Sequence, residues 1–387
     1  MEELIDKKKT INGYILLFLL IPFFKPDIVT SFPKVNYIFT IWLMISFAII
    51  VAVYMKKFRI SKLTMTYLAY NLVLLISTIK NNGSITKFLS DFSMNLGMIF
   101  LIELYLKNDK MKIMKVLSSI FYFLMVLNTI SFIIVPEGLA VTQYLKTPIY
   151  LLGIDNRFSF TYIPGLCVIA IYDFMKNNKI TKLTIIYFMI TFITFVYFWS
   201  AGALVAESMF FIYYIFIYKL KYKHFTNKYF PIIIVSFLGL VVFRVQNIFR
   251  FFIVDILHKD LTFSSRTILW DKAIKIINNN MWLGTGIQKS EFSIKAISAF
   301  HAHSHFLNIM FQSGIIGVII YIYLIFDAFK RLNEYRKNVI AQMVAFTLFV
   351  LFIMLTVDTF DITANLFLII CIGYNISCFN QKGEESD

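Results

Sequence analysis

Charge is what this sequence has least of. Asp, Glu, Lys and Arg together make up 15% of the 387 residues, whereas apolar residues make up 59%. A soluble globular chain carries about 25% charged residues, so the composition excludes a soluble protein. A helix needs about 20 residues to cross a hydrocarbon layer of about 30 Å, and this chain has room for about a dozen crossings. We expect an all-α integral membrane protein with about 12 transmembrane helices.

Linkers and repeats are missing as well. Between the apolar runs there is no tract rich in Pro, Gly or Ser, no low-complexity segment and no repeat at a fixed period. Their absence argues against solenoids and against jointed multidomain chains. We therefore predict a single polytopic membrane domain over residues 1–387.

Cysteines are few, and the basic residues lack the pattern of a nucleic-acid-binding protein. Cys167, Cys371 and Cys378 lie inside apolar runs without C-x-x-C spacing, which predicts buried thiols. Lys and Arg number 37 against 22 Asp and Glu, but they form short clusters between the apolar runs. Such clusters indicate membrane topology, and no nucleic-acid partner is expected.

Apolar runs bounded by charges or proline mark the expected crossings. Lys and Arg concentrate on the side of the N-terminus, so we expect a multi-pass protein of the cytoplasmic membrane with both termini in the cytoplasm. Ser200-Ala201-Gly202 is interpreted as a tight hairpin inside an unusually long apolar stretch. The twelve expected crossings cover residues 11–24, 35–55, 61–79, 85–106, 113–135, 158–175, 183–200, 202–218, 229–249, 303–329, 339–357 and 362–379.

The longest connection, residues 250–302, is predicted to be a large extracytoplasmic loop between crossings nine and ten. Ser265 precedes apolar residues at helical spacing, including Trp270, with Lys272 and Lys275 on the opposite side. This pattern predicts an amphipathic helix that starts near Ser265 and lies on the membrane surface. The stretch Trp282-Leu-Gly-Thr-Gly286 should close it with an interfacial aromatic and two flexible glycines.

A row of histidines, His301-Ala-His303-Ser-His305, lies where this polar segment meets the next apolar run. The simplest interpretation is a helix-start or interfacial histidine without a role. A second is zinc binding, because an extended backbone would place all three rings on one side. No carboxylate or cysteine in that stretch completes a ligand set, so no metal is expected.

Ionisable residues inside or beside the apolar runs form a second group of candidates. Such residues cost several kcal/mol in a membrane and mark functional sites or structural pairs. Arg244 could pair structurally with Glu207 or with Asp91. By the predicted topology, the residues at the outer side are Asp91, Glu207 and Arg244 within crossings, and Asp155, Arg157, Arg266, Asp358 and Asp361 in loops.

Four short motifs occur in a recognisable order. They are Ser265-Arg266-x-x-x-Trp270, Leu283-Gly284-x-Gly286, His303-Ser304-x-x-Leu307 and Gly314-x-x-Gly317. Their order and spacing resemble the bacterial O-antigen polymerase and O-antigen ligase family. The close resemblance covers residues 265–326, and the large loop before the tenth crossing extends it loosely over the chain.

This resemblance implies a GT-C-like helical bundle and a metal-independent glycosyltransferase without a cofactor. The family takes glycans from undecaprenyl diphosphate outside the cytoplasmic membrane. His303 would be the catalytic base and Arg266 would hold the diphosphate. Relatives often carry Ser-Arg-Gly where this chain has Ser200-Ala201-Gly202, so Arg157 or Arg244 would have to substitute. The supporting residues would be Glu207, Asp91, Asp358, Asp361, His301 and His305.

The side-chain chemistry agrees with these roles. The planar fork of arginine binds phosphate oxygens bidentately. Histidine, with an unperturbed pKa of about 6.5, is largely neutral at neutral pH and can accept the proton of an acceptor hydroxyl.

We expect a polymerase that joins lipid-linked oligosaccharide repeats into a capsular, O-antigen or other exopolysaccharide. The expected partners are the lipid-linked oligosaccharide, as donor and acceptor, membrane lipids, a flippase and a chain-length regulator. Lys-, Asn-, Ile- and Phe-rich usage, typical of AT-rich genomes, favours a capsule builder over a ligase that serves another envelope acceptor. A flippase is the alternative from a different class, but the internal repeats and midplane charges typical of transporters are not evident. A non-catalytic assembly partner is the third possibility.

Overall fold

The computed structural model describes residues 13–57, 60–142, 146–220, 226–258, 260–263, 265–359 and 363–380, with the backbone alone over 214–220. Within these residues the regular structure is helical except for one two-stranded antiparallel hairpin, β1 (Ala140–Val141) with β2 (Pro148–Ile149). The chain divides into two compact units, Met1–Phe58 with Gly97–Thr191 and Arg59–Leu96 with Phe192–Asp387. The expectation of one domain stays a prediction.

The first unit contains the hairpin and the connection around Arg157. Arg157 Nη1 lies 3.0 Å from Asp27 Oδ2. Gly153 has φ +103°, and a Cβ there would lie 2.4 Å from the same carboxylate, which explains the glycine. The helical elements of this unit are α1 (Gly13–Leu20), η1 (Ile21–Phe24), η2 (Asp27–Ser31), α2 (Pro33–Lys57), the part of α4 (Ile85–Ile134) after Leu96, η3 (Asp155–Arg157), α5 (Ser159–Asn177) and most of α6 (Lys182–Tyr197).

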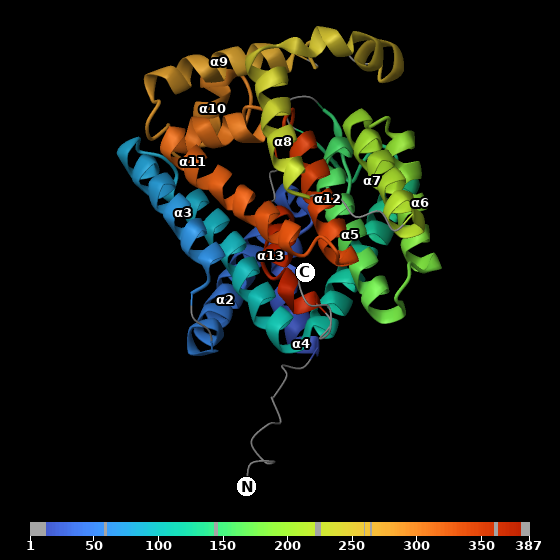
Figure 1. Ribbon diagram of the computed structural model, residues 1–387. Helices are drawn as coiled ribbons and strands as arrows, with labels where there is room; N and C mark the ends of the chain where they lie inside the picture. Colours follow the sequence, from blue (N-terminus) through green and yellow to red (C-terminus); the bar gives the residue numbers. More distant parts are fainter. Residues whose placement is uncertain are drawn as a thin grey trace. The chain divides into compact units, whose positions relative to one another are not determined.

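The second unit is built around the long helix α11, which packs against α3, α12 and α13 (Figure 1). Its elements are α3 (Lys62–Lys80), the start of α4, α7 (Ala201–Leu220), η4 (Thr226–Lys228), α8 (Tyr229–Phe237), η5 (Leu238–Val242), η6 (Val245–Phe249), η7 (Phe251–Ile256), α9 (Arg266–Asn279), α10 (Ser290–Ile297), α11 (His305–Glu334), α12 (Val339–Met354), α13 (Ala364–Tyr374) and η8 (Ile376–Phe379).

Polar residues set several of the helix starts. The Ser61 side chain accepts a hydrogen bond from the Thr64 amide at 3.0 Å and caps α3. Asn338 accepts from the Ile340 amide at 2.8 Å and caps α12. The helical structure also breaks at Ser200, because α6 ends at Tyr197 and α7 begins at Ala201. The tight hairpin expected there stays a prediction.

In the described part of the chain, five helical stretches are long and apolar enough to cross a membrane, namely Pro33–Lys56, Lys62–Lys80, Ile85–Ile134, Asp155–Asn177 and His305–Glu334. Several shorter apolar helices accompany them. The 50-residue α4 has non-helical dihedral angles at Asp109, between two of the expected crossings. The chain is therefore a membrane protein whose described residues are almost all helical, and the count of twelve crossings stays a prediction.

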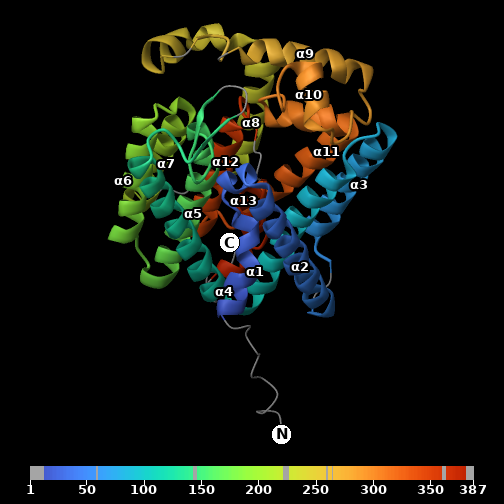
Figure 2. The same cartoon turned by 180° about the vertical axis from the view of Figure 1, so that it is seen from behind.

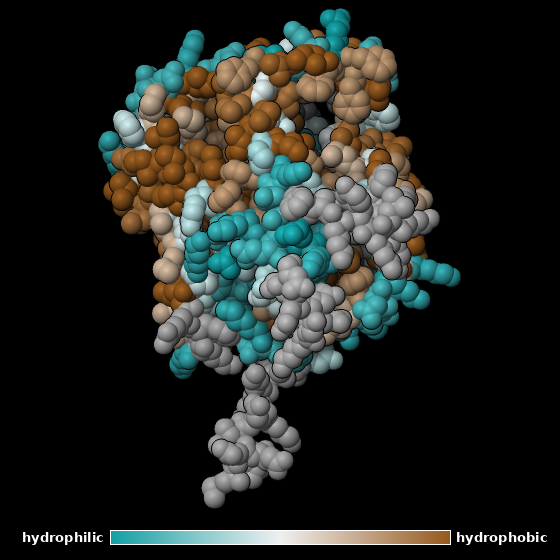
Figure 3. Space-filling model, in the orientation of Figure 1, coloured by the Kyte–Doolittle hydropathy of each residue, from teal (hydrophilic) through white to brown (hydrophobic). Residues whose placement is uncertain are grey.

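The surface agrees with this class. Figure 3 shows apolar side chains exposed over the upper part of the face on which α8 and α11 lie. Along α11, Ile316, Ile319, Tyr323 and Phe326 are exposed. They recur at helical spacing and form one stripe, as expected for a helix that faces lipid.

The crossing expected over residues 229–249 is wrong after Val242. Helix α8 and the π turn after it stop before Arg244, whose φ of +56° turns the chain. The next segment, Val245–Ile256, runs across α8 rather than continuing it (Figure 1). Ile248 and Phe251 are 78% and 70% exposed, whereas Gln246 is buried. The long connection therefore begins with an apolar segment of the kind that lies in a membrane interface.

The helix expected from Ser265 is present as α9, and Ser265 occupies its N-cap. Its apolar stripe, Trp270, Ala273 and Ile277, is buried in a cluster with Ile297 of α10 and Leu307 of α11. The stripe therefore packs on protein, and α9 and α10 together cover one end of α11 (Figures 1 and 2). The location of α9 at a membrane surface stays a prediction.

Candidate functional site

Helix α11 is interrupted at Gly314, where φ is +61° and ψ is −167°. A break of this kind leaves carbonyls without their usual amide partners. The loop after α9 supplies replacements, because the amides of Thr285 and Gly286 donate to the carbonyls of Phe311 and Gln312 at 2.8 and 2.9 Å. A Cβ on Gly314 would lie 2.3 Å from the carbonyl oxygen of Trp282. The two glycine motifs therefore form one backbone joint.

The same loop is also held by the end of α3. The Ile287 amide donates to Thr78 Oγ1 at 3.0 Å, and its carbonyl accepts from the Ser84 amide at 2.7 Å. A Cβ on Gly286 would lie 2.4 Å from Thr78 Cα. The expectation that the two loop glycines are simply flexible is therefore wrong: they permit close packing on both sides.

His303 lies before α11 rather than inside it. The helix begins at His305, and His303 has φ +47°. The expected helical start at His303 is therefore two residues too early. Trp270 Nε1 of α9 donates to the His303 carbonyl at 3.3 Å and anchors this loop. The ring of His301 lies beside it, with 4.2 Å between the two centroids.

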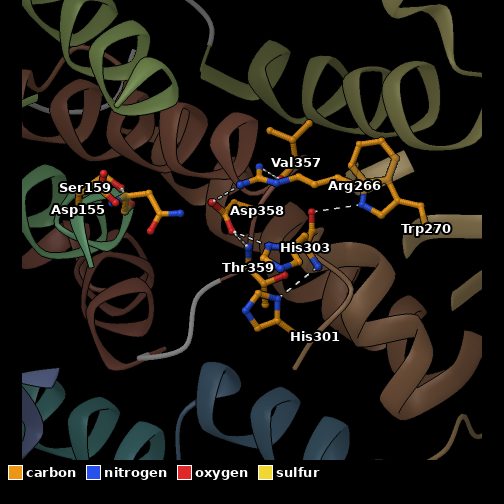
Figure 4. A network of polar contacts seen from close by, with 10 residues as sticks. Asp155, Ser159, Arg266, Trp270, His301, His303, Val357, Asp358 and Thr359 are labelled. Carbon is orange, nitrogen blue, oxygen red and sulfur yellow. Dashed lines mark hydrogen bonds and ion pairs between the residues drawn. The ribbon is translucent and has the colours of Figure 1, made fainter. Parts of the chain in front are cut away.

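Asp358, in the connection between α12 and α13, joins the two residues to which the resemblance assigns the chemistry (Figure 4). Its Oδ2 lies 3.3 Å from Arg266 Nη2, and its Oδ1 lies 3.8 Å from His303 Nδ1. The Thr359 amide donates to Oδ1 at 2.8 Å, and Arg266 Nη1 donates to the Val357 carbonyl. Arg266, Asp358 and His303 thus form one network.

The charge of this network follows from its contacts. Burial raises the pKa of Asp358, but His303 and Arg266 lower it, and the pKa lies below its ordinary value. Asp358 is therefore ionised at neutral pH and pairs with the Arg266 guanidinium. The His303 side chain is 30% exposed. Since its Nδ1 faces Asp358, Nε2 is the ring nitrogen available to a substrate.

Arg244 approaches the same helix from the turn after α8. Its Nη2 donates to Asp271 Oδ1 at 2.6 Å and to the Thr267 carbonyl at 3.3 Å. Its guanidinium also lies over the Trp270 ring, 4.8 Å from the centroid. Two arginines are thus held on α9, Arg266 as its first residue and Arg244 through these contacts. The ion pair found for Arg244 is with Asp271, and not with Glu207 or Asp91 as the structural alternative supposed.

His305 and Asp91 belong to a different part of this unit. His305 is 5% exposed, and its Nε2 lies 2.8 Å from the Tyr321 hydroxyl. Together with His301 and Asp91 it lines a cavity of about 160 Å³. Within the residues that the structure describes, no group of three or more His, Cys, Asp or Glu side chains could hold a metal ion.

The remaining candidates are dispersed. Glu207 is buried in α7, 1% exposed. Asp155 and Arg157 belong to the first unit, where Arg157 pairs with Asp27. Asp361 lies outside the described residues. The sequence did not predict Asp271, the partner of Arg244, or Tyr321, the partner of His305. An acidic residue on a polar helix face and a tyrosine in an apolar run carry no signal of their own.

Comparison with known proteins bears on the same region. A family model described as O-antigen ligase matches residues 186–322. The matched segment contains Arg244, Arg266, the histidine row and the Gly314 break, and the resemblance is confirmed for this part of the chain. Neither the curated proteins nor the solved structures give a match.

Proposed function

We propose that this chain, whose residues 186–322 match a family model described as O-antigen ligase, is a membrane glycosyltransferase that polymerises lipid-linked oligosaccharide repeats. The observation that carries the proposal is the network in which Asp358 lies between Arg266 and His303. One carboxylate there orients both a cation suited to a diphosphate and a histidine suited to a hydroxyl.

In the proposed step the acceptor hydroxyl attacks the anomeric carbon of the donor sugar, and His303 Nε2 takes its proton. The bond between that carbon and the diphosphate oxygen breaks, and the diphosphate leaves with the electron pair. Arg266 and Arg244 stabilise the charge that grows on it. Asp358 keeps the imidazole oriented and stabilises the imidazolium that forms. The proton then passes to solvent or to the leaving diphosphate.

The donor in this proposal is an oligosaccharide on undecaprenyl diphosphate, and the acceptor is a second lipid-linked repeat. The network would face outside the cytoplasmic membrane, with both termini inside, as the distribution of Lys and Arg favours. The product would be a capsular or other O-antigen-type polysaccharide. A flippase and a chain-length regulator would act beside the enzyme. Transfer to another envelope acceptor is the ligase alternative.

The test uses purified protein in lipid vesicles and lipid-linked repeats extracted from cells that lack this gene. The wild type should give a ladder of polymer lengths. His303→Ala should lower the rate by about a hundred- to ten-thousand-fold, the usual contribution of general-base catalysis. Single repeats joined only to a different envelope molecule would favour the ligase. A wild-type ladder of polymer lengths from His303→Ala would show that His303 is not the catalytic base.

A further inference from the structure

Beside the histidine row, the second unit contains a cavity of about 160 Å³ that lies outside the Arg266–Asp358–His303 network. Helix α11 contributes His305, Asn308 and Gln312 to its wall. Their spacing of three and four residues places them on one helix face. Placing polar side chains of an otherwise apolar helix in a membrane is unfavourable in free energy, so such a stripe occurs where it contacts water or a ligand.

Two further helices present polar side chains to the same space. Asn71 comes from α3, and Asp91 and Asn95 come from α4, again at helical spacing. Aromatic rings, Tyr70 and Phe88, complete these walls. The lining therefore alternates amide groups with aromatic side chains.

Two buried polar atoms of this wall, His305 Nδ1 and Thr359 Oγ1, have no hydrogen-bond partner among the residues that the structure describes. His305 is 5% exposed, and its Nε2 is engaged by Tyr321. Its Nδ1 is buried and forms no hydrogen bond with any described residue. A buried nitrogen without a hydrogen-bond partner destabilises the folded protein, and in a native protein it calls for an explanation. A ligand hydroxyl in the cavity would supply the missing partner.

We propose that this cavity binds one sugar residue of the acceptor glycan. The inference rests on the proposed glycosyl transfer and adds to it the place and chemical class of the acceptor. Amides and imidazoles both donate and accept hydrogen bonds, as sugar hydroxyls do. Lys87 and Asp91 balance in charge, so the lining does not favour a phosphate or a free ion. The volume equals that of roughly five waters at about 30 Å³ each, room for a single ring rather than a chain.

The position of the cavity suits an acceptor. His301 lines it, and the His301 ring is 4.2 Å from the ring of His303. Thr359, the residue after Asp358, lines it too. A sugar held there would present a hydroxyl beside the proposed base.

The experiment measures binding of a named probe, the oligosaccharide freed by mild acid from the repeats that accumulate in cells without this gene. It is titrated calorimetrically into full-length protein in lipid nanodiscs. Gln312→Leu removes one amide, while the Gln312 backbone carbonyl that holds Gly286 is kept. A hydrogen bond contributes about 0.5 to 1.5 kcal/mol, so the affinity should fall about two- to tenfold. Lys87→Met, at an exposed position, is a second variant that should also weaken binding.

Ile319→Leu is the matched control, because Ile319 lies on the same helix and is exposed outside the cavity. Its affinity should equal that of the wild type. Unchanged affinity in both Gln312→Leu and Lys87→Met, or an equal loss in the control, would overturn the sugar site. Polymer formation by the wild type is scored separately, so the sugar site and the proposed function can fail independently.

Discussion

Asp358 is the residue whose importance the structure changes most. The sequence placed it among the supporting charges, because nothing in its neighbourhood connects it with His303 or with the start of α9. Folding brings the connection between α12 and α13 to Arg266, at 3.3 Å, and to His303, at 3.8 Å. The family motifs indicated Arg266 and His303. The position of the Asp358 carboxylate between them follows only from the three-dimensional structure.

Asp358→Asn should therefore impair transfer although it preserves the shape of the side chain. A neutral amide can neither pair with the Arg266 guanidinium nor stabilise an imidazolium on His303. A loss of up to about ten-thousandfold is expected, the effect of replacing the carboxylate that orients a catalytic histidine in a Ser-His-Asp triad. The measurement is the initial rate of polymer formation in vesicles. Asp255→Asn, which changes an exposed carboxylate elsewhere, should retain the wild-type rate, and an equal rate in Asp358→Asn would contradict the network.

Arg266→Lys should impair transfer nearly as much as Arg266→Ala. Arg266 contacts Asp358 and the Val357 carbonyl through two different nitrogens, and a single ammonium cannot reproduce that fork or bind a diphosphate bidentately. The rates of both variants, normalised to protein present in the membrane, give the comparison. Full activity of Arg266→Lys would show that a positive charge alone suffices at this position. Full activity of Arg266→Ala would show that Arg266 has no role in the site.

At the scale of elements, the spacing of apolar residues predicted the positions of helices. It did not predict whether the apolar stripe of a helix packs against lipid or against protein. The spacing of Trp270, Ala273 and Ile277 predicted α9, but the same stripe suits a lipid surface or a protein neighbour, and the structure buries it against α10 and α11. Likewise the apolar run 229–249 predicted a straight crossing. Its turn at Arg244 has no signal in hydropathy, because the segment beyond the turn is also apolar.

The glycine joint leads to a prediction about stability. Gly314→Ala should destabilise the protein by about 2 kcal/mol or more, because its φ and ψ are nearly exclusive to glycine and a Cβ would collide with the Trp282 carbonyl. Thermal unfolding of the purified protein measures it. Gly202→Ala is the control, since a Cβ there meets nothing within 4 Å and alanine favours a helix. Equal melting temperatures for the two variants would mean that the joint tolerates a side chain.

At the scale of the whole molecule, composition alone predicted a helical membrane protein, and the five sufficiently long apolar helical stretches among the described residues agree. Orientation is different, because it depends on where Lys and Arg lie relative to a membrane and not on contacts within the protein. It stays a prediction, and α11 offers the means to test it. The continuous part of this helix after the Gly314 break, residues 315–334, has 20 residues, about 30 Å at 1.5 Å per residue. That length matches a hydrocarbon layer of about 30 Å, so the two ends of α11 should lie on opposite sides of the bilayer.

Single cysteines at Lys275 and Lys330, in a variant without the native cysteines, would report the two sides. Lys275 is exposed on α9, which covers the first end of α11, and Lys330 is exposed near the other end. If the histidine row faces outward, an impermeant maleimide should modify Lys275→Cys on intact cells, and Lys330→Cys only after the membrane is opened. The reverse pattern would place the network in the cytoplasm, where a donor that had already crossed the membrane could not reach it.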